Sequence, residues 1–302
     1  MGGRVASCLI LLLLFLVMFD EASAEVGEKS KQMEAESADN GVIKMVTKMA
    51  YNSQELNSMA DQQHHADDSS SSHMEHMNDP AQIFFTINDL KLGKKLPLYL
   101  APKDPSTSPP MVAKEIADSI PFSLEQLPEI LRFFSFSPGS RQARAVETTL
   151  HQCEHKRVEG ETKFCSTSME SMADFARLAL GLASKSSLKH LVTTHLTKPR
   201  PPYLQNYTLL QMPNAVTKFL ACHLMTYPYA VHYCHYLHGG DKALQILLEG
   251  DNGNVVMAAA VCHMDTSGWT PDHVSFRVLK TKPGIVPICH IFPPNDLILI
   301  PM

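Results

Sequence analysis

Four Cys-His dipeptides organise the last eighty or so residues of this chain and constrain its fold more than any other feature. They are Cys222-His223, Cys234-His235, Cys262-His263 and Cys289-His290, separated by ten, twenty-six and twenty-five residues. The whole chain of 302 residues has only seven cysteines, so this clustering is not a product of composition. Every cysteine of the C-terminal part therefore stands next to a residue that can ligate a metal.

The N-terminus has the layout of a secretory signal peptide. Arg4 precedes an apolar run from Leu9 to Phe19, which is too short to span a bilayer, and Ala22-Ser23-Ala24 forms a cleavage site after Ala24. An uncleaved anchor is the alternative. No later segment is long and apolar enough to be a transmembrane anchor. We therefore expect a soluble protein of the secretory pathway, either extracellular (cell wall) or vacuolar.

The secretory pathway is oxidising, so the cysteines of the mature chain are disulfide candidates. There are six: Cys153, Cys165, Cys222, Cys234, Cys262 and Cys289. Six cysteines allow 15 pairings, and the sequence does not choose among them. Asn206-Tyr207-Thr208 is a glycosylation sequon, which makes Asn206 a candidate site in the same compartment.

Charge divides the chain into a tail and a domain. The net charge is −5, but residues 25–82 alone hold eleven acidic and four basic residues, a net of −7. Residues 83–302 are only slightly basic, which does not favour nucleic acid as a partner. The tail has one aromatic residue and no cysteine, so we expect it to be disordered. Its histidines and methionines near residues 64–77 either hold Cu or Zn loosely or belong to a polar linker.

Residues 83–302 read as one α+β domain in which helices precede a mostly antiparallel, disulfide-stapled β region. The helical part covers about 111–182 and the β-rich part about 188–302. Expected helices are 111–120, 124–134 with a start near Leu127, 141–154, and one opened by a Thr167–Glu170 capping box. Expected strands are two within 83–100 around a Gly93 turn, then 188–196, 207–212, 216–222, 230–234, 244–248, 255–262, 274–279 and 285–290. Apart from the Cys-His spacing, no internal repeat is evident.

Strand geometry assigns different tasks to the two residues of each dipeptide. Successive side chains of a strand point to opposite faces, so cysteines would form disulfides on one face while histidines gather on the other. Imidazole suits Cu and Zn, which makes His223, His235, His263 and His290 a candidate metal set. The alternatives are a mixed Cys and His zinc site, whose usual spacing is absent, or histidines that only satisfy polar groups around a disulfide core. Further histidines that could add ligands are His190, His195, His232, His238 and His273.

Taken together, these motifs resemble the plant BURP domain. The Cys-His spacing looks like its signature, and Phe84-Phe85 with Asp89-Leu90 and Gly93 looks like its opening. Segments 152–154, 160–165 and 168–172 resemble its middle, and 227–231, 260–267 and Trp269 resemble its core. The resemblance covers residues 83–302. The short tail without long tandem repeats is similar to the seed-protein-type branch of the family.

The resemblance implies two different kinds of function. Some members of that family have no known catalysis and act in walls, vacuoles, seed development or stress. Others are copper-dependent peptide cyclases that cross-link a Trp or Tyr side chain of a core peptide, often within their own N-terminal region. The tail of this chain has no Trp, since Trp269 is the only one, and Tyr51 is its one aromatic residue.

We therefore expect a non-catalytic secreted or vacuolar protein with a role in seed or other development or in stress. The alternative is a copper-dependent cyclase that uses the four histidines. Expected partners are cell-wall or seed-vacuole components, or a peptide substrate in the second case.

Overall fold

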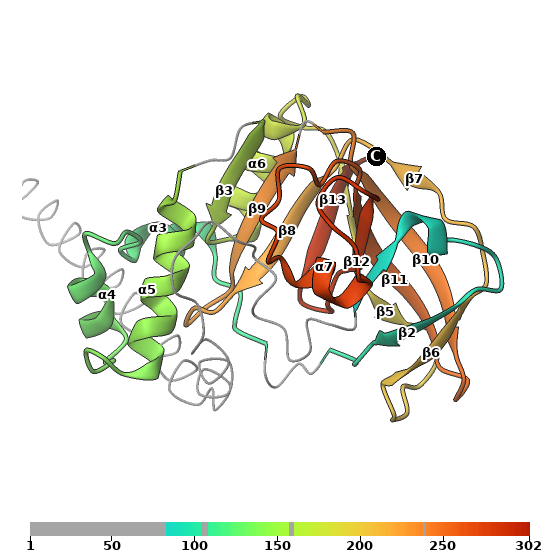
Figure 1. Ribbon diagram of the computed structural model, residues 1–302. Coiled ribbons are helices and arrows are strands. Elements are labelled where there is room, and N and C mark those ends of the chain that lie inside the picture. The colour runs from blue at the N-terminus through green and yellow to red at the C-terminus, as the bar shows by residue number, and fades with distance from the viewer. Residues whose placement is uncertain (1–82, 104–107, 157–159, 238) are drawn as a thin grey trace, which may run out of the picture. The chain divides into compact units, whose positions relative to one another are not determined.

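The computed structural model describes residues 83–302 except for 104–107, 157–159 and 238. The predicted signal peptide (1–24, with its cleavage site at Ala24) and acidic tail (25–82) lie outside the described residues. Within the described part the fold is α+β, and a group of helices precedes most of the strands, as predicted (Figure 1).

The elements are as follows in chain order. They are β1 (Phe84–Thr86), the 3₁₀ helix η2 (Ile87–Asp89), β2 (Lys95–Tyr99), α3 (Lys114–Ser119), α4 (Leu127–Phe133), α5 (Arg141–Glu154), β3 (Glu161–Ser166), α6 (Met169–Ala179), β4 (Leu188–Leu191), β5 (Thr194–His195), β6 (Leu204–Leu209), β7 (Ala215–Val216), β8 (Leu220–Met225), β9 (Val231–Leu237), β10 (Lys242–Gly250), β11 (Val255–His263), α7 (Val274–Leu279), β12 (Ile288–Ile291) and β13 (Leu297–Pro301).

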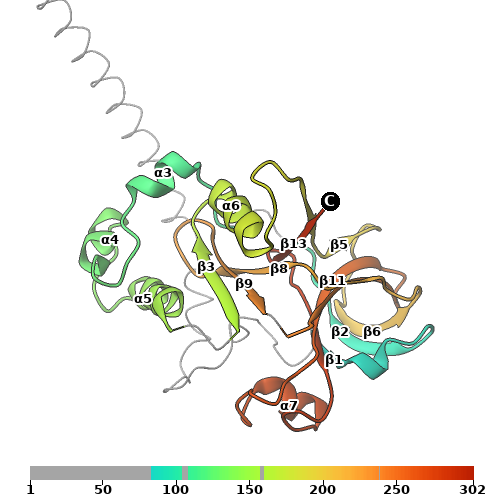
Figure 2. The same ribbon diagram turned by 90° about the horizontal axis from the view of Figure 1, so that it is seen from above.

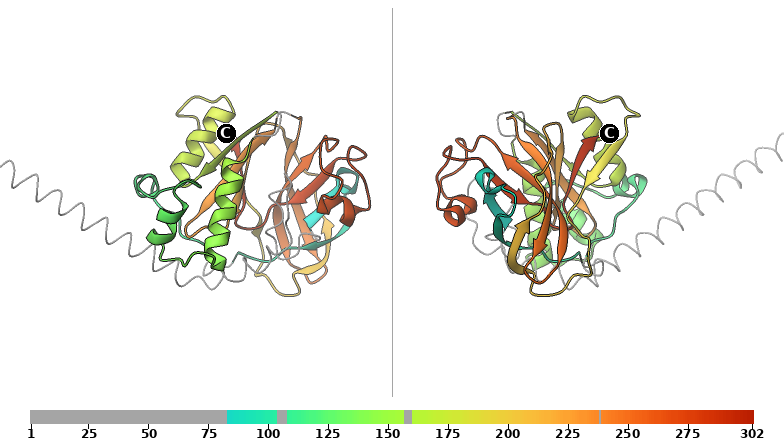
Figure 3. Two further views of the ribbon diagram at one scale, coloured as in Figure 1. Left: turned by 60° about the vertical axis from the view of Figure 1, so that its left-hand side comes forward. Right: turned by 90° about the vertical axis from the view of Figure 1, so that its right-hand side faces the viewer.

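The strands form two sheets, and every pairing in the described part is antiparallel. The first, here called sheet A, has eight strands in the order β1-β12-β11-β10-β6-β2, with β5 added to β11 and β7 to β10. The second, sheet B, has five strands in the order β3-β9-β8-β13-β4. The chain thus crosses from sheet B to sheet A after β9 and returns after β12. Figure 3 shows the helices and strands of the domain from two further sides.

Sheet A curls around a core of its own. Phe84 and Phe85 of β1 and Leu96 and Leu98 of β2 belong to one apolar cluster, although β1 and β2 stand at opposite ends of the strand order. Such a contact is only possible if the sheet bends until its two ends approach each other. Phe276 of α7 joins the same cluster, so this helix packs against the β1 end.

The two sheets also pack against each other, and sheet B is covered on its other face by α6. Between the sheets lie small and branched side chains such as Ala221 of β8, Val261 of β11 and Ile298 of β13. On the far side of sheet B, Met172 and Ala176 of α6 pack on the strands, and Figure 2 shows this helix lying against β3. The central strands of sheet B therefore have two buried faces: β8 has buried residues on both sides, whereas the outer strands β3 and β4 are partly exposed.

Two helices begin where the sequence predicts, and the start of a third differs from the prediction. Helix α5 has the predicted bounds, and the Ser140 hydroxyl accepts the N–H of Ala143 at its start. Helix α4 begins at Leu127, where Pro128 is tolerated in the first turn. The predicted Thr167–Glu170 capping box is wrong.

The residues that cap α6 are one position further along. Ser168 accepts the N–H of Ser171, and the Ser171 hydroxyl accepts the N–H of Ser168. A serine at the third helical position can serve in place of the Glu that the usual pattern requires, because its hydroxyl reaches back to the same backbone group.

Three elements of the domain differ in type from the prediction or are absent from it. Residues Val274–Leu279 form helix α7, not a strand. His273 caps its start and Lys280 ends it in the left-handed conformation (φ 52°). A six-residue apolar-polar alternation does not separate a strand from a helical turn, and here packing of Phe276 decides. The strands β3 and β13 were not predicted, since one is polar and the other lacks alternation.

All six candidate cysteines are paired in the structure. Cys222–Cys234 joins β8 to β9 and Cys262–Cys289 joins β11 to β12, each at directly opposed positions of the register. Their Cα–Cα separations are 4.0 and 3.9 Å. Cys153–Cys165 links α5 to β3. One disulfide therefore ties each central strand pair, and a third ties the helices to sheet B.

Removal of the two strand disulfides should destabilise the domain to different extents. The closed segments differ, with sequence separations of 12 and 27. Chain entropy alone predicts losses of about 2.8 kcal/mol for Cys222→Ala with Cys234→Ala, and about 3.6 kcal/mol for Cys262→Ala with Cys289→Ala. Urea unfolding at pH 7 measures both. The two pairs are matched, because all four cysteines are fully buried. A smaller loss in the second variant would contradict the expectation.

Candidate functional site

The four Cys-His dipeptides divide their side chains between two faces of each sheet. Cys222 and Cys234 lie in the core under α6, and Cys262 and Cys289 lie in the curled core of sheet A. Because successive side chains alternate, the histidine that follows each cysteine points to the opposite face, where the two sheets meet. The arrangement is the one that strand geometry predicts from the sequence.

Within each strand pair the two histidines are diagonal neighbours. His223 stands opposite Tyr233 and His235 stands opposite Ala221, so the two rings lie on one face, one on each side of the disulfide. Their ring centroids are 5.5 Å apart. His263 and His290 repeat the arrangement on β11 and β12, again with 5.5 Å between centroids.

The two histidine pairs meet across the interface between the sheets. The ring centroids of His223 and His290 are 6.3 Å apart, and Phe292 packs on both rings with centroid distances of 4.8 and 5.2 Å. His223, His263 and His290 expose less than a tenth of their surface. We call these four residues (His223, His235, His263, His290) the histidine cluster. The fold brings together the whole predicted set.

Two aspartates hold the first histidine of each pair in the same way. Asp296 Oδ2 is 2.8 Å from His223 Nδ1, and Asp241 Oδ2 is 2.7 Å from His263 Nδ1. The other oxygen of each carboxylate accepts a backbone N–H at 2.9 Å, from Leu224 and Met264 respectively. Each carboxylate therefore binds one histidine ring and the peptide that follows it, which fixes the position of the ring.

A third carboxylate lies beside His235. Glu161 Oε1 is 3.4 Å from His235 Nδ1, and it accepts the hydroxyl of Tyr233 at 2.9 Å. The Nδ1 atom of His290 is buried with no hydrogen-bond partner among the described residues. The cluster thus contains three imidazoles beside carboxylates and a fourth, that of His290, for which the described residues show no carboxylate contact.

Burial keeps the second histidine of each pair neutral. It lowers the pKa of His235, although the neighbouring Glu161 opposes this effect. It lowers the pKa of His290 well below its ordinary range, and His263 and His223 lower it further, because a second positive charge nearby would be unfavourable. Neutral imidazole is the form that binds metals.

The residues fit a copper ion in their chemistry. Imidazole is a donor that suits Cu, and it suits Zn as well. Ligating histidines in proteins usually donate their other ring N–H to a carboxylate, backbone carbonyl or water, and His223 and His263 can donate to a carboxylate here. As the side chains lie, no three His, Cys, Asp or Glu groups in the described ranges are close enough to hold a metal ion together. Binding would therefore require the imidazoles to come closer together than they lie here.

An oxidisable aromatic side chain lies next to the cluster. The ring centroid of Trp269 is 5.0 Å from that of His263 and 4.5 Å from that of His273. Trp269 is partly buried against the core of sheet A. It is the one tryptophan of the chain, so a group bound by His263 would have this indole as its neighbour.

The other histidines that the sequence singled out do not join the cluster. His190 is exposed on β4, His195 lies on β5, and His232 lies on the face of β9 that carries Cys234. His273 caps α7, where its Nδ1 accepts the N–H of Ser275. His238 is outside the described residues.

The predicted glycosylation site lies apart from the histidine cluster. Asn206 is exposed on β6, where its side-chain amide donates to Asp251 at 3.3 Å. Its exposure is compatible with a glycan, and its use as a glycosylation site stays a prediction.

The carboxylates of the site are the functional residues that sequence reasoning missed. Asp241 and Asp296 are isolated acidic residues in connections between strands, and nothing in their immediate surroundings marks them. A signal exists, however: each follows the second histidine of a pair by six residues, as His235 to Asp241 and His290 to Asp296. No comparable spacing from a Cys-His dipeptide marks Glu161 in the sequence.

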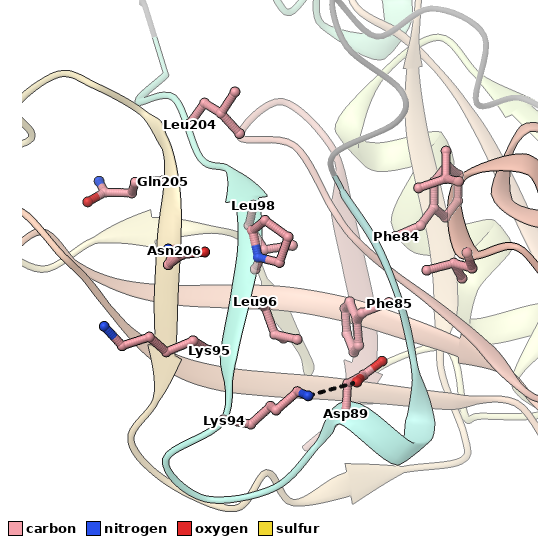
Figure 4. Close-up of a pocket in the computed structure, with 13 residues that line it drawn as sticks. Phe84, Phe85, Asp89, Lys94, Lys95, Leu96, Leu98, Leu204, Gln205 and Asn206 are labelled. Atoms are coloured by element: carbon pink, nitrogen blue, oxygen red, sulfur yellow. Dashed lines mark ion pairs between the residues drawn. The ribbon is translucent and has the colours of Figure 1, made fainter.

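The structure also contains a pocket away from the histidine cluster. It has a volume of about 750 Å³ and lies between β1, β2, β6 and α7. Figure 4 shows Phe85 and Leu96 on its wall and the ion pair of Lys94 with Asp89 at its edge. None of the four histidines lines this pocket.

The fold and the site define a class: a disulfide-stapled α+β domain built around paired cystines and histidines. The profile of the BURP domain family matches residues 83–301, and the chain belongs to that family. It is 44% identical to BURP domain-containing protein BNM2A of Brassica napus over 225 residues, 72% of this chain and 79% of that protein. It is 40% identical to BURP domain protein USPL1 of Arabidopsis thaliana, with 74% and 81% covered.

A third relative shares the domain but has a longer chain around it. Protein RAFTIN 1B of Triticum aestivum is 37% identical over 219 residues, which are 72% of this chain and 59% of that protein. The family profile covers residues 83–301, which include the histidine cluster. No helix among the described residues has the length and hydropathy needed to cross a membrane.

Acidification should destabilise the domain through its buried histidines. Burial and the nearby His263 lower the pKa of His273 to about 4, whereas an unfolded histidine titrates near pH 6.5. Below pH 6.5 the unfolded chain therefore binds a proton that the folded chain excludes, so the free energy of unfolding falls as pH drops from about 6.5 to 4. His273→Asn keeps a capping acceptor but cannot titrate, and it should flatten this slope in urea titrations with a chelator present. An unchanged slope would contradict the assignment.

Proposed function

We propose that this chain is a secretory-pathway plant protein with a role in seed or other development or in the stress response, and that its domain binds copper without catalysing a reaction. The observation that carries the proposal is the convergence of four imidazoles, two of them fixed by aspartates, at the buried interface of the sheets. Similar BURP domain proteins from several plants support the family context.

Burial of the cluster favours binding over catalysis. His290 exposes 3% of its surface and His223 exposes 6%, so a peptide side chain cannot reach these rings without movement of the domain. An ion is small enough to enter after local fluctuations. A copper site of this kind would stabilise the folded state, because a ligand that binds only the native protein adds to its stability.

The secretory pathway accounts for the three disulfides. Such bonds form in oxidising compartments, and the predicted signal peptide provides entry to them. The destinations we propose are the cell wall or a vacuole. Wall or vacuolar components are the partners we propose.

A second candidate function is that of a copper-dependent peptide cyclase. The observation that favours it is the indole of Trp269 beside His263, because it shows that an oxidisable ring fits next to the cluster. Copper would supply one-electron chemistry when bound. Each cross-link on a Tyr or Trp side chain removes two electrons and two protons, so the reaction would consume an oxidant such as dioxygen.

Copper binding can be tested directly on the purified protein. We expect elemental analysis to find Cu retained after gel filtration of wild-type protein loaded with Cu(II), and we expect a higher melting temperature in the loaded sample. Replacement of His263 and His290 by Ala should abolish retention, whereas replacement of the exposed His190 should not. Equal retention by the two variants would exclude the histidine cluster as the site.

The same samples separate the two candidate functions. Intact mass should stay unchanged, apart from the metal, when loaded protein is incubated with air and a Tyr- or Trp-bearing peptide. A loss of two hydrogens from the peptide or the chain, absent without Cu, would favour the cyclase and contradict the non-catalytic proposal.

Entry into the secretory pathway can be tested by the mature N-terminus. When the full chain is expressed in plant cells, we expect the purified protein to begin at Glu25, because the signal peptide is cut after Ala24. Terminal sequencing by mass spectrometry measures this. A chain that keeps its first 24 residues would show that the predicted site is not cleaved, and an Ala24→Gln variant provides the matched uncleaved control.

A further inference from the structure

The two aspartates of the site occupy equivalent places in a repeated unit. Asp241 follows His235 by six residues and Asp296 follows His290 by six residues. Each stands one residue before a strand, Asp241 before β10 and Asp296 before β13. The unit is therefore a strand with a Cys-His pair, a connection that ends in Asp, and a further strand.

The two connections cross between the sheets in opposite directions. After β9 of sheet B the chain passes to β10 of sheet A, and after β12 of sheet A it passes to β13 of sheet B. The first residue of each new strand stands opposite the first cysteine of the other pair: Lys242 pairs with Cys262, and Leu297 pairs with Cys222. Each aspartate thus arrives beside the first histidine of the opposite sheet.

The equivalence extends to the residues around the aspartates. Two residues after each Asp, Ala243 and Ile298 both enter the core between the sheets. Three residues after it, Leu244 and Leu299 both enter the outer cores. In each half, the strand that pairs with the second cysteine-bearing strand also occupies an equivalent place.

That outer strand places a phenylalanine opposite the cysteine in both units. Phe164 of β3 pairs with Cys234, and Phe85 of β1 pairs with Cys289. Strands β8, β9 and β10 therefore correspond to β11, β12 and β13, and each half of the domain supplies an aspartate to the other half.

We propose that Asp241 and Asp296 are the positioning residues of the histidine cluster, each setting the tautomer of one histidine contributed by the opposite half. A carboxylate oxygen accepts but does not donate, so the 2.7–2.8 Å contacts require Nδ1–H on His263 and His223. The neutral ring then carries its lone pair on Nε2, which makes Nε2 the metal-binding nitrogen. The identity of the metal rests on the proposed function, whereas the assignment of the tautomers does not depend on which metal is bound.

The carboxylate is required because it accepts twice. One oxygen binds the ring and the other binds the N–H of Met264 or Leu224 at 2.9 Å. An asparagine of the same size has one accepting oxygen and one donating NH₂ group. If its oxygen keeps the backbone N–H, its NH₂ faces Nδ1, and the ring must change to the Nε2–H tautomer.

The test is imidazole ¹⁵N NMR of the metal-free full chain at pH 7.5. In the wild type we expect Nδ1–H on both His223 and His263. Asp241→Asn should convert His263 to Nε2–H and leave His223 unchanged, and Asp296→Asn should do the reverse. Asp265→Asn is the matched control: Asp265 lies two residues beyond His263, is exposed, and accepts the N–H of Ser267 instead of a ring. It should change neither tautomer.

Copper affinity provides the second measurement. Loss of an outer partner of a metal-binding histidine weakens metal binding by about 10- to 100-fold, so Asp241→Asn and Asp296→Asn should each weaken Cu(II) binding by this factor while Asp265→Asn does not. A wild-type protein that binds no Cu(II) but shows the expected tautomers would contradict the proposed function and leave the positioning role supported.

Two results would overturn the positioning role. One is a wild-type spectrum with Nε2–H on His223 or His263, which needs no variant and therefore decides the matter even if a substituted chain fails to fold. The other is a folded Asp241→Asn protein in which His263 keeps Nδ1–H. A change of both rings in both variants would likewise contradict assignment of one aspartate to one histidine.

Discussion

Directly opposed cystines determine the arrangement of the rest of this domain. Cys222–Cys234 and Cys262–Cys289 each hold two antiparallel strands in one register, at Cα separations near 4 Å. Once the cysteines are opposed and face an outer core, the next residue on each strand must face the other way. Four histidines are thereby directed to the interface between the sheets. A slip of one residue in either pair would send its histidines into the outer core instead.

The histidines can occupy this interface because their ring nitrogens have hydrogen-bond partners or because the rings are uncharged. A buried imidazolium without a partner would be unfavourable, and burial accordingly lowers the pKa of His290 and His235. Aspartates brought in by the two crossover connections bind the remaining rings. The connections thus link the two sheets and supply the carboxylates that orient the histidine rings. The same two segments therefore determine both the order of the strands and the geometry of the site.

Much of the fold could be predicted from local patterns. Helix α5 has its predicted bounds because Ser140 caps it and its buried face repeats along the helix, and the separation of cysteine and histidine faces follows from strand alternation. Helix α7 could not be predicted, since its six residues alternate like a strand and only the packing of Phe276 makes them helical. The strand β13 escaped detection because it is buried on both faces and shows no alternation.

The sequence by itself determined the family, the number of cysteines and the four candidate histidines, because these depend on residue identity and spacing along the chain. Only the tertiary structure decided which cysteines pair, that the histidines of two sheets meet, and that Asp241 and Asp296 belong to the site. Those facts depend on strand order and register, which bring together residues far apart in the chain, such as His223 and Asp296, 73 positions apart. The repeated spacing from Cys-His to Asp can be read from the sequence. That each aspartate binds a histidine of the other half of the domain follows only from the way the two connections cross between the sheets.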